Sequence, residues 1–523
     1  MPLALSLSFF APIALILAAI FAAYRPGQRP GILPRLSEAV ALLALALCAG
    51  GLAQVVAGAA QPVSILSGPF QLSLRADLVS ATMALLVGFI GWIVMRYSRS
   101  YLDGEEREGA FHALMLTPLA SVLVFAQAGS FATLVLGTFA VGLTLKRLLL
   151  FYPDRPEAQR AATKFTLVWR AGDVLLVASA GLLFWTFGTL DLAALGAAAS
   201  EQPLGFTGGA AISFLIAAAA LKTASFPLHG WLTEVMEAPT PVSALLHAGI
   251  INSGGGLLIA NAQLVQQSSG AMAALVMVGG LTALFGAAVM LTQSAVKTAL
   301  AWSTVSQMGF MLLQCGLGLW TLALLHIVAH SLYKAHAFLS SGGAVNEVTS
   351  IRRPGPVAAP NVKAVVNSFA LAILLYAIIA GAFIFVFGPK TPQALALGAI
   401  LIFGVAYMVA QGLADLAPRQ LTQRLVGSSL LAAIAYFSFQ VLAQAAWGPF
   451  LPTAPVPGPL EWALIVVAVT SFGLVAFAQA LFPLWAHHPS TAGLRVHLAN
   501  GLYLNALLDR AIGGFAATKS TSQ

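Results

Sequence analysis

Long apolar stretches alternate with short polar loops along the whole chain. Most of these stretches hold about 20 residues, the length that crosses the hydrocarbon core of a bilayer as a helix. The pattern predicts an all-α polytopic membrane protein with about 15 transmembrane helices. The expected helices cover residues 3–23, 36–58, 77–96, 110–127, 130–151, 164–187, 209–226, 241–264, 271–293, 298–316, 319–344, 364–388, 393–413, 425–446 and 459–484.

Composition supports a membrane protein. Of the 523 residues, 59% are hydrophobic and 8% are charged, against roughly 25% charged in soluble domains. The net charge of +8 does not indicate a nucleic-acid partner, because no basic cluster is interleaved with aromatic residues. Cys48 and Cys315 both lie in apolar stretches with no second thiol nearby. We therefore expect no disulfide framework, metal site or cofactor in this chain.

The basic residues predict the orientation in the membrane. Eighteen of them follow odd-numbered helices or lie in the C-terminal tail, whereas only Arg75 and Lys390 follow even-numbered ones. Because Lys and Arg gather in cytoplasmic loops, the N-terminus is expected outside and the C-terminus in the cytoplasm of a bacterial inner membrane. The first stretch, Leu3–Tyr24, is too long for a signal-peptide core and is expected to remain as a span.

The segment Leu221–Gly256 carries the strongest indication of function. It places Lys222 at the end of one apolar helix and His247 inside the next, with Glu237 in the connection. Prolines break the helix between them, at Pro227, Pro239 and Pro241. Ionisable side chains at membrane depth are costly, and a helix is broken there only where it is buried in protein or lines a wet cavity. We therefore expect part of an ion path.

A second polar stripe lies within the eleventh expected helix. His326, His330 and Lys334 recur every four residues, so they share one helix face about 6 Å apart per step. A single buried histidine is more often a packing residue, but three ionisable groups on one stripe favour proton transfer.

Other ionisable groups leave alternatives open. Asp173 follows Arg170 by three residues, a spacing that also fits a local ion pair. Lys297, at the start of the tenth helix, supports the ion path or lies at the membrane interface. Glu234 fits a solvated loop as well as a functional role. From His487 onward the chain is amphipathic, which suits the membrane surface or a partner.

These segments resemble a known family. Leu221–Gly255, the run KTALAWSTVSQMGF from Lys297 and the run HIVAHSLYKAHAFL from His326 are similar to the antiporter-like subunits of respiratory complex I and of multisubunit cation/proton antiporters. The resemblance implies two inverted five-helix repeats, each with a broken helix. It implies a relay through Lys222, His247, His326, His330 and Lys334, with Asp173 and Lys297 as supporting members. The expected divisions are 1–109, 110–264 (first repeat), 265–413 (second repeat), 414–486 and the tail 487–523.

Two departures from that family narrow the interpretation. Phe139 stands where the family has a glutamate that pairs with the lysine of the broken helix. The run Leu371–Gly388, expected to be the second broken helix, carries no charge. These differences disfavour a complete relay of the complex I type.

A closer resemblance is to the membrane subunits of two-component DAB inorganic carbon transporters. It is carried by MEAPTPVSALLHAG with Glu237, by HSLYKAHAFLSSG and by the tail run VHLANGLYLNALLDR. The resemblance implies a large DabA-like soluble partner with a zinc site, driven by H⁺ or Na⁺ flow through this chain to hydrate CO2. The chain itself would then be no enzyme. The alternatives are a subunit of complex I or a membrane-bound hydrogenase, and a Na⁺/H⁺ antiporter subunit.

Overall fold

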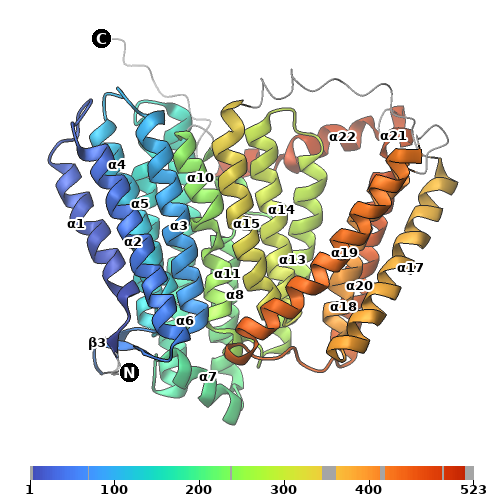
Figure 1. Cartoon of the computed structure of the whole chain (residues 1–523), viewed down its shortest axis with the longest axis horizontal. Helices are drawn as coiled ribbons and strands as arrows, with labels where there is room; N and C mark the ends of the chain where they lie inside the picture. Colours follow the sequence, from blue (N-terminus) through green and yellow to red (C-terminus); the bar gives the residue numbers. More distant parts are fainter. Residues whose placement is uncertain are drawn as a thin grey trace.

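The computed structural model is a bundle of long helices (Figure 1). It describes residues 4–68, 70–235, 238–343, 361–412, 419–485 and 488–512. A helix occupies each of the apolar stretches expected from the sequence. The long helices are α1 (Ala11–Ala23), α2 (Leu33–Val56), α3 (Leu78–Tyr101), α4 (Glu108–Ala126), α5 (Phe131–Leu149), α6 (Pro156–Phe187), α8 (Gly205–Lys222), α13 (Ser269–Met290), α14 (Val296–Gly316), α15 (Trp320–Ser340), α17 (Val362–Phe387), α18 (Pro392–Gly412), α19 (Arg419–Trp447) and α20 (Pro459–Ala480).

Short elements join and cap these helices. They are α7 (Leu192–Glu201), α9 (Gly230–Thr233), α10 (Thr240–Ala248), α11 (Ser253–Ala260), α12 (Ala262–Val265), α21 (Phe482–Trp485), α22 (Ala492–Ala499) and α23 (Leu504–Ala511). Strands β1 (Ala4–Leu5) and β2 (Ala60–Gln61) pair in parallel, and β3 (Val63–Leu66) and β4 (Leu72–Leu74) form an antiparallel hairpin.

Among the described residues, 12 helical segments are long and apolar enough to cross a membrane. Two shorter apolar helices, Leu7–Ala23 and Pro392–Gly404, occupy further expected spans. The chain is therefore an all-α multi-pass membrane protein, as expected. The count of fifteen crossings, the repeats and the orientation of the termini stay predictions.

The two ends of the bundle differ. One end carries the β3–β4 hairpin and α7, and we call it the hairpin face; the other carries α21 and α22, and we call it the tail face (Figure 1). The largest apolar core draws mainly on α1 to α15, while smaller cores join α17, α18, α19 and α20 to one another and to α13–α15. The helices after α15 thus form a separate flank of the molecule.

Glycines bring α13 and α14 into backbone contact. A Cβ atom on Gly279 would lie 2.5 Å from the backbone nitrogen of Leu313, and one on Gly316 would lie 2.6 Å from that of Val276. Small residues at such crossings let membrane helices approach closely, so that dispersion forces act along their length. This pair forms a rigid wall beside the polar segments.

The predicted break after Lys222 is present. Helix α8 ends at that residue, Ala224 adopts a positive φ of 51°, and Pro227 lies in the connector before α10. Pro239 caps α10, and Pro241 lies in its first turn, where a missing N–H costs nothing.

Two details differ from expectation. The stretch expected as one helix over 241–264 is divided into α10, a 3₁₀ turn and the short helices α11 and α12, because Gly249 leaves helical geometry (φ −118°, ψ −72°). Conversely, α17 runs unbroken over 26 residues where the resemblance implied a broken helix. From Leu371 to Phe387 its sequence is apolar except for Tyr376, so it offers almost no polar partner that would satisfy a break within the membrane.

Candidate functional site

Lys222 and Asp173 form a buried ion pair between α8 and α6. The Lys222 Nζ atom lies 2.7 Å from Asp173 Oδ1, and its side chain is fully buried. The ammonium also lies 4.2 Å from the centre of the Trp169 ring, a favourable cation–π contact. The sequence left open whether Asp173 pairs locally with Arg170; the structure shows both contacts, since Arg170 Nη1 donates to Asp173 Oδ2 at 2.7 Å.

The surrounding sequence makes room for this pair. A Cβ atom on Gly172 would lie 3.3 Å from Lys222 Cε, so glycine lets the lysine cross between the helices. Phe139, which replaces the expected glutamate, lies under the Arg170 guanidinium at 4.0 Å from its ring centre. Asp173 therefore has two cationic partners, Arg170 and Lys222.

His247 lies in α10 against α15. Its Nδ1 atom is 3.1 Å from Thr304 Oγ1, and its ring stacks on Phe338 with centres 4.3 Å apart. The other ring nitrogen, Nε2, is buried without a hydrogen-bond partner. Buried polar atoms usually have one, so this nitrogen is free to accept or donate a proton through water.

The predicted stripe on α15 is present. The rings of His326 and His330 have centres 5.9 Å apart, and both line a cavity of about 460 Å³ together with Ser303, Gln307 and Tyr333. His326 Nδ1 lies 2.9 Å from Gln314 Oε1. The Nε2 atoms of both histidines are buried without partners. The cavity is otherwise lined largely by apolar side chains, so the two histidines lie with Ser303 and Gln307 in its polar part.

Lys334 ends the stripe without a carboxylate. It is fully buried, and its Nζ atom donates to the Leu300 backbone carbonyl at 3.0 Å. No ion pair joins it to an acidic group among the described residues. Lys297 lies at the start of α14 and donates to Thr240 Oγ1 at 3.1 Å, which ties it to the start of α10.

The structure thus gathers the predicted residues into two groups. Asp173 and Lys222 form one; His247, His326, His330 and Lys334 form the other, along the contact of α10 with α15. Within the described residues no hydrogen bond joins the two groups directly. Glu237 lies outside the described residues.

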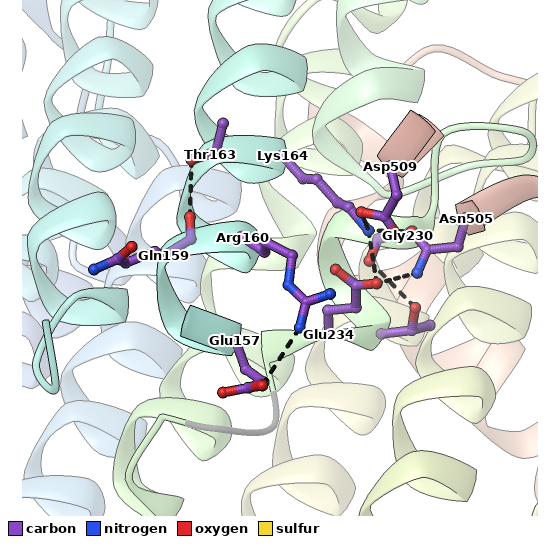
Figure 2. A network of polar contacts seen from close by, with 10 residues as sticks. Glu157, Gln159, Arg160, Thr163, Lys164, Gly230, Glu234, Asn505 and Asp509 are labelled. Carbon is purple, nitrogen blue, oxygen red and sulfur yellow. Dashed lines mark hydrogen bonds and ion pairs between the residues drawn. The ribbon is translucent and has the colours of Figure 1, made fainter. Parts of the chain in front are cut away.

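A third cluster, which the sequence did not predict, lies at the tail face (Figure 2). Lys164 of α6 is fully buried between two carboxylates: its Nζ lies 2.6 Å from Glu234 Oε1 and 2.5 Å from Asp509 Oδ1. Asn505 accepts from Lys164 at 2.8 Å and donates to Glu234. The cluster joins α6, the connector after α8 and the C-terminal helix α23.

The tail packs on its own chain rather than leaving it. Asn505 lies directly against Gly230, whose lack of a side chain makes the approach possible. Gln293 donates to the Ala499 carbonyl at 3.3 Å. A Cβ atom on Gly501 would lie 3.2 Å from the Trp302 ring. The tail therefore covers the connector that the prolines create.

Lys164 was not predicted from the sequence because the start of α6 was misplaced. The helix begins at Pro156, two turns before the expected start, so a lysine that counted as a loop charge lies inside the bundle. Its acidic partners lie in two distant polar segments. The spacing of residues along the sequence does not show that a basic residue at 164 pairs with them.

Comparison with known proteins shows the family to which the chain belongs. The family model described as NADH:quinone oxidoreductase/Mrp antiporter, TM, matches residues 128–355, and the complex I chain 5 N-terminus model matches 63–112. The probable inorganic carbon transporter subunit DabB2 of Halothiobacillus neapolitanus is 35% identical over 450 residues, which cover 85% of this chain and 80% of that protein. The chain belongs to the DabB family.

A second DabB relative, from Hydrogenovibrio crunogenus, is 43% identical over 287 residues, 54% of this chain and 55% of that one. NADH-quinone oxidoreductase subunit L of Mycobacterium tuberculosis is 35% identical over 54% of this chain and 45% of its own length. The DabB resemblance thus extends further along the chain than the complex I one.

Solved structures share the fold. The Mrp complex of Dietzia sp. matches 97% of this chain and 59% of the compared chain, with a TM-score of 0.62 and 22% identity. An archaeal membrane-bound sulfane sulfur reductase matches 96% and 99%, with a TM-score of 0.60 and 16% identity. The DabB family chain therefore has the antiporter-like fold.

Proposed function

We propose that this chain is the proton-translocating membrane subunit of a two-component inorganic carbon transporter. Its family relatives support a cation-translocating membrane subunit. In our proposal, proton flow through the chain drives CO2 hydration in a large, zinc-containing soluble partner, and bicarbonate accumulates. The complex would lie in a bacterial inner membrane, with the tail face in the cytoplasm.

The buried Asp173–Lys222 pair is the observation that carries the proposal. Charged side chains at membrane depth are rare and mark ion pathways or proton relays. Lysine is suited to this because burial readily changes its protonation. The carboxylate of Asp173 supports proton release from Lys222: when the lysine becomes neutral, the aspartate keeps its ion pair with Arg170 and is not left as an unpaired buried charge.

The second group continues the path. The unpartnered Nε2 atoms of His247, His326 and His330 are the acceptors that a water-borne proton needs. Lys334 has no counter-ion in the described part of the chain, so a proton that binds its Nζ atom is stabilised only by the hydrogen bond that Nζ donates to the Leu300 carbonyl. A weakly held proton is easily passed on.

The alternative functions are an ion-pumping subunit of complex I or of a membrane-bound hydrogenase, and a Na⁺/H⁺ antiporter subunit. Both share the lysine and histidine groups, which do not discriminate between them. The contact of Arg170 with Phe139 and the unbroken α17, which has no charged residue from Leu371 to Phe387, differ from what those families imply. We therefore favour the inorganic carbon transporter.

Purification of the tagged chain from its native membrane in mild detergent tests the proposal. Mass spectrometry of the co-purifying proteins and a zinc assay of the complex are the readouts. One large zinc-containing soluble partner is expected. Iron–sulfur proteins, or several other antiporter-like chains in its place, would overturn the proposal in favour of an alternative.

A further inference from the structure

A series of cavities connects the hairpin face with the interior. The outermost, of about 790 Å³, is lined by Arg75, Asp77 and Val79 among others, and we call it the vestibule. A second, of about 20 Å³, shares Arg75 and Val79 with the vestibule and is also lined by Met83 and Phe125. Because the two cavities share wall residues, only side chains separate them.

A third cavity lies deeper. It also measures about 20 Å³ and shares Met83 and Phe125 with the second, but its inner wall carries Asn252 and Ser331. Each small cavity has room for about one water molecule. Ser331 follows His330 directly and lies one helical turn before Lys334 on α15. The series therefore ends beside the second group of the candidate relay.

Asn252, Ser253 and Ser331 are the polar residues in the otherwise apolar lining of the third cavity. The Asn252 side chain is 3% exposed. Its Nδ2 atom donates to the Ala248 carbonyl and to Ser331 Oγ, both at 3.0 Å, while Oδ1 is buried without a hydrogen-bond partner. An unsatisfied buried amide oxygen costs about 1–3 kcal/mol. A water molecule in the cavity that Asn252 lines removes this cost.

We infer that these cavities form the proton route between the relay and the hairpin face, an inference that rests on the proposed function. The route runs from Lys334 past Ser331 and Asn252, between Met83 and Phe125, to Arg75 and the vestibule. It takes the place of the exit that α17, uncharged from Leu371 to Phe387, cannot supply. Met83 and Phe125 form an apolar constriction of the kind that gates by dewetting.

The narrow inner part of the route gives it a preference for protons. Its two cavities hold about one water molecule each, and their described lining carries no carboxylate that could replace the hydration shell of a metal cation. At the vestibule, Arg75 Nε lies 3.4 Å from Asp77 Oδ2 in a partly buried ion pair. A proton passes from one water molecule to the next and through the Asp77 carboxylate. No hydrated ion therefore has to enter the route. The coupling ion for this route is H⁺ and not Na⁺.

Substitution of Asn252 tests the polar site. In the intact complex, Asn252→Leu removes the amide and fills the cavity, and we expect carbon uptake to fall by about a hundredfold, the low end for loss of a positioned proton-transfer group. Asn252→Ser keeps a hydroxyl for water and should retain most of the uptake. Equal uptake by Asn252→Leu and the parent complex would overturn the route.

Substitution of Phe125 tests the gate without relying on carbon uptake. In liposomes holding the complex, Phe125→Ala should raise the passive proton leak at least about tenfold by widening the constriction. Adding Lys334→Ala should abolish that leak. Phe111→Ala is the matched control, a buried phenylalanine of the same helix that packs edge-to-face against Phe151 and lines none of these cavities.

The outcomes separate the route from the proposed function. If Lys222→Ala and Lys334→Ala both abolish uptake while Phe125→Ala does not leak, the relay stands and the route is wrong. If either lysine variant transports fully, the relay itself is wrong. A sodium dependence of the Phe125→Ala leak would overturn the preference for protons.

Discussion

Replacement of Asp509 by alanine should release helix α23 from the connector. Asp509 forms one of two ion pairs of the fully buried Lys164, at 2.5 Å, and its own side chain is 9% exposed. Loss of one partner of a buried pair costs about 3–5 kcal/mol when the other charge is left alone. Lys164 still keeps Glu234 at 2.6 Å, so loss of the Asp509 ion pair costs less than that range, about 2 kcal/mol.

That cost shifts the ratio of docked to undocked tail about 30-fold. Hydrogen exchange of the backbone amides of α23 measures this directly, because exchange follows the free energy of local opening. We expect exchange to accelerate by about the same factor while α6 exchanges as before. Arg510→Ala is the control, since Arg510 neighbours Asp509 on the same helix and its side chain is exposed.

A second variant tests the magnitude. Lys164→Ala leaves the carboxylates of Glu234 and Asp509 facing each other without a cation, so it should open the tail more than Asp509→Ala does. Unchanged α23 exchange in Asp509→Ala would refute the role of the ion pair. A smaller effect for Lys164→Ala than for Asp509→Ala would refute the assignment of the lysine as the centre of the cluster.

Three further variants also have expected outcomes. Lys222→Ala should abolish carbon uptake while the complex still assembles, and full uptake by that variant would contradict the relay. Gly230→Ala introduces a methyl group against Asn505, so it should displace the tail and accelerate exchange of α23 without changing any charge; normal exchange would show that the contact is not tight. Truncation after Leu484 removes the whole tail and should weaken partner binding in a pull-down, whereas an intact complex would exclude the tail from the interface.

The long helices were predictable because a bilayer imposes a simple rule. Apolar segments of about 20 residues must satisfy their backbone internally, so length and hydropathy suffice to find them. The Lys222 break followed from the same rule, since prolines beside ionisable groups interrupt an apolar helix only where the freed backbone finds polar surroundings. The stripe on α15 followed from helical periodicity alone.

What the sequence did not predict depends on contacts between distant segments. Asp173 pairs with Lys222 as well as with Arg170 because α6 packs on α8. The spacing of residues along the sequence does not show that packing. The Lys164 cluster combines residues 164, 234, 505 and 509, and amphipathicity of the tail could not say which face turns inward. The unbroken α17 was missed because the expectation came from resemblance and not from its own apolar sequence.

The Lys164 cluster also fixes an order of events during synthesis. Glu234 leaves the ribosome 70 residues after Lys164, and Asn505 only 341 residues after it. At roughly 5–20 residues per second, Lys164 waits some tens of seconds for its last partners. Until then it has one carboxylate at the membrane surface, and the connector beside it is uncovered. A chain released early therefore lacks the final contact, and its connector stays uncovered.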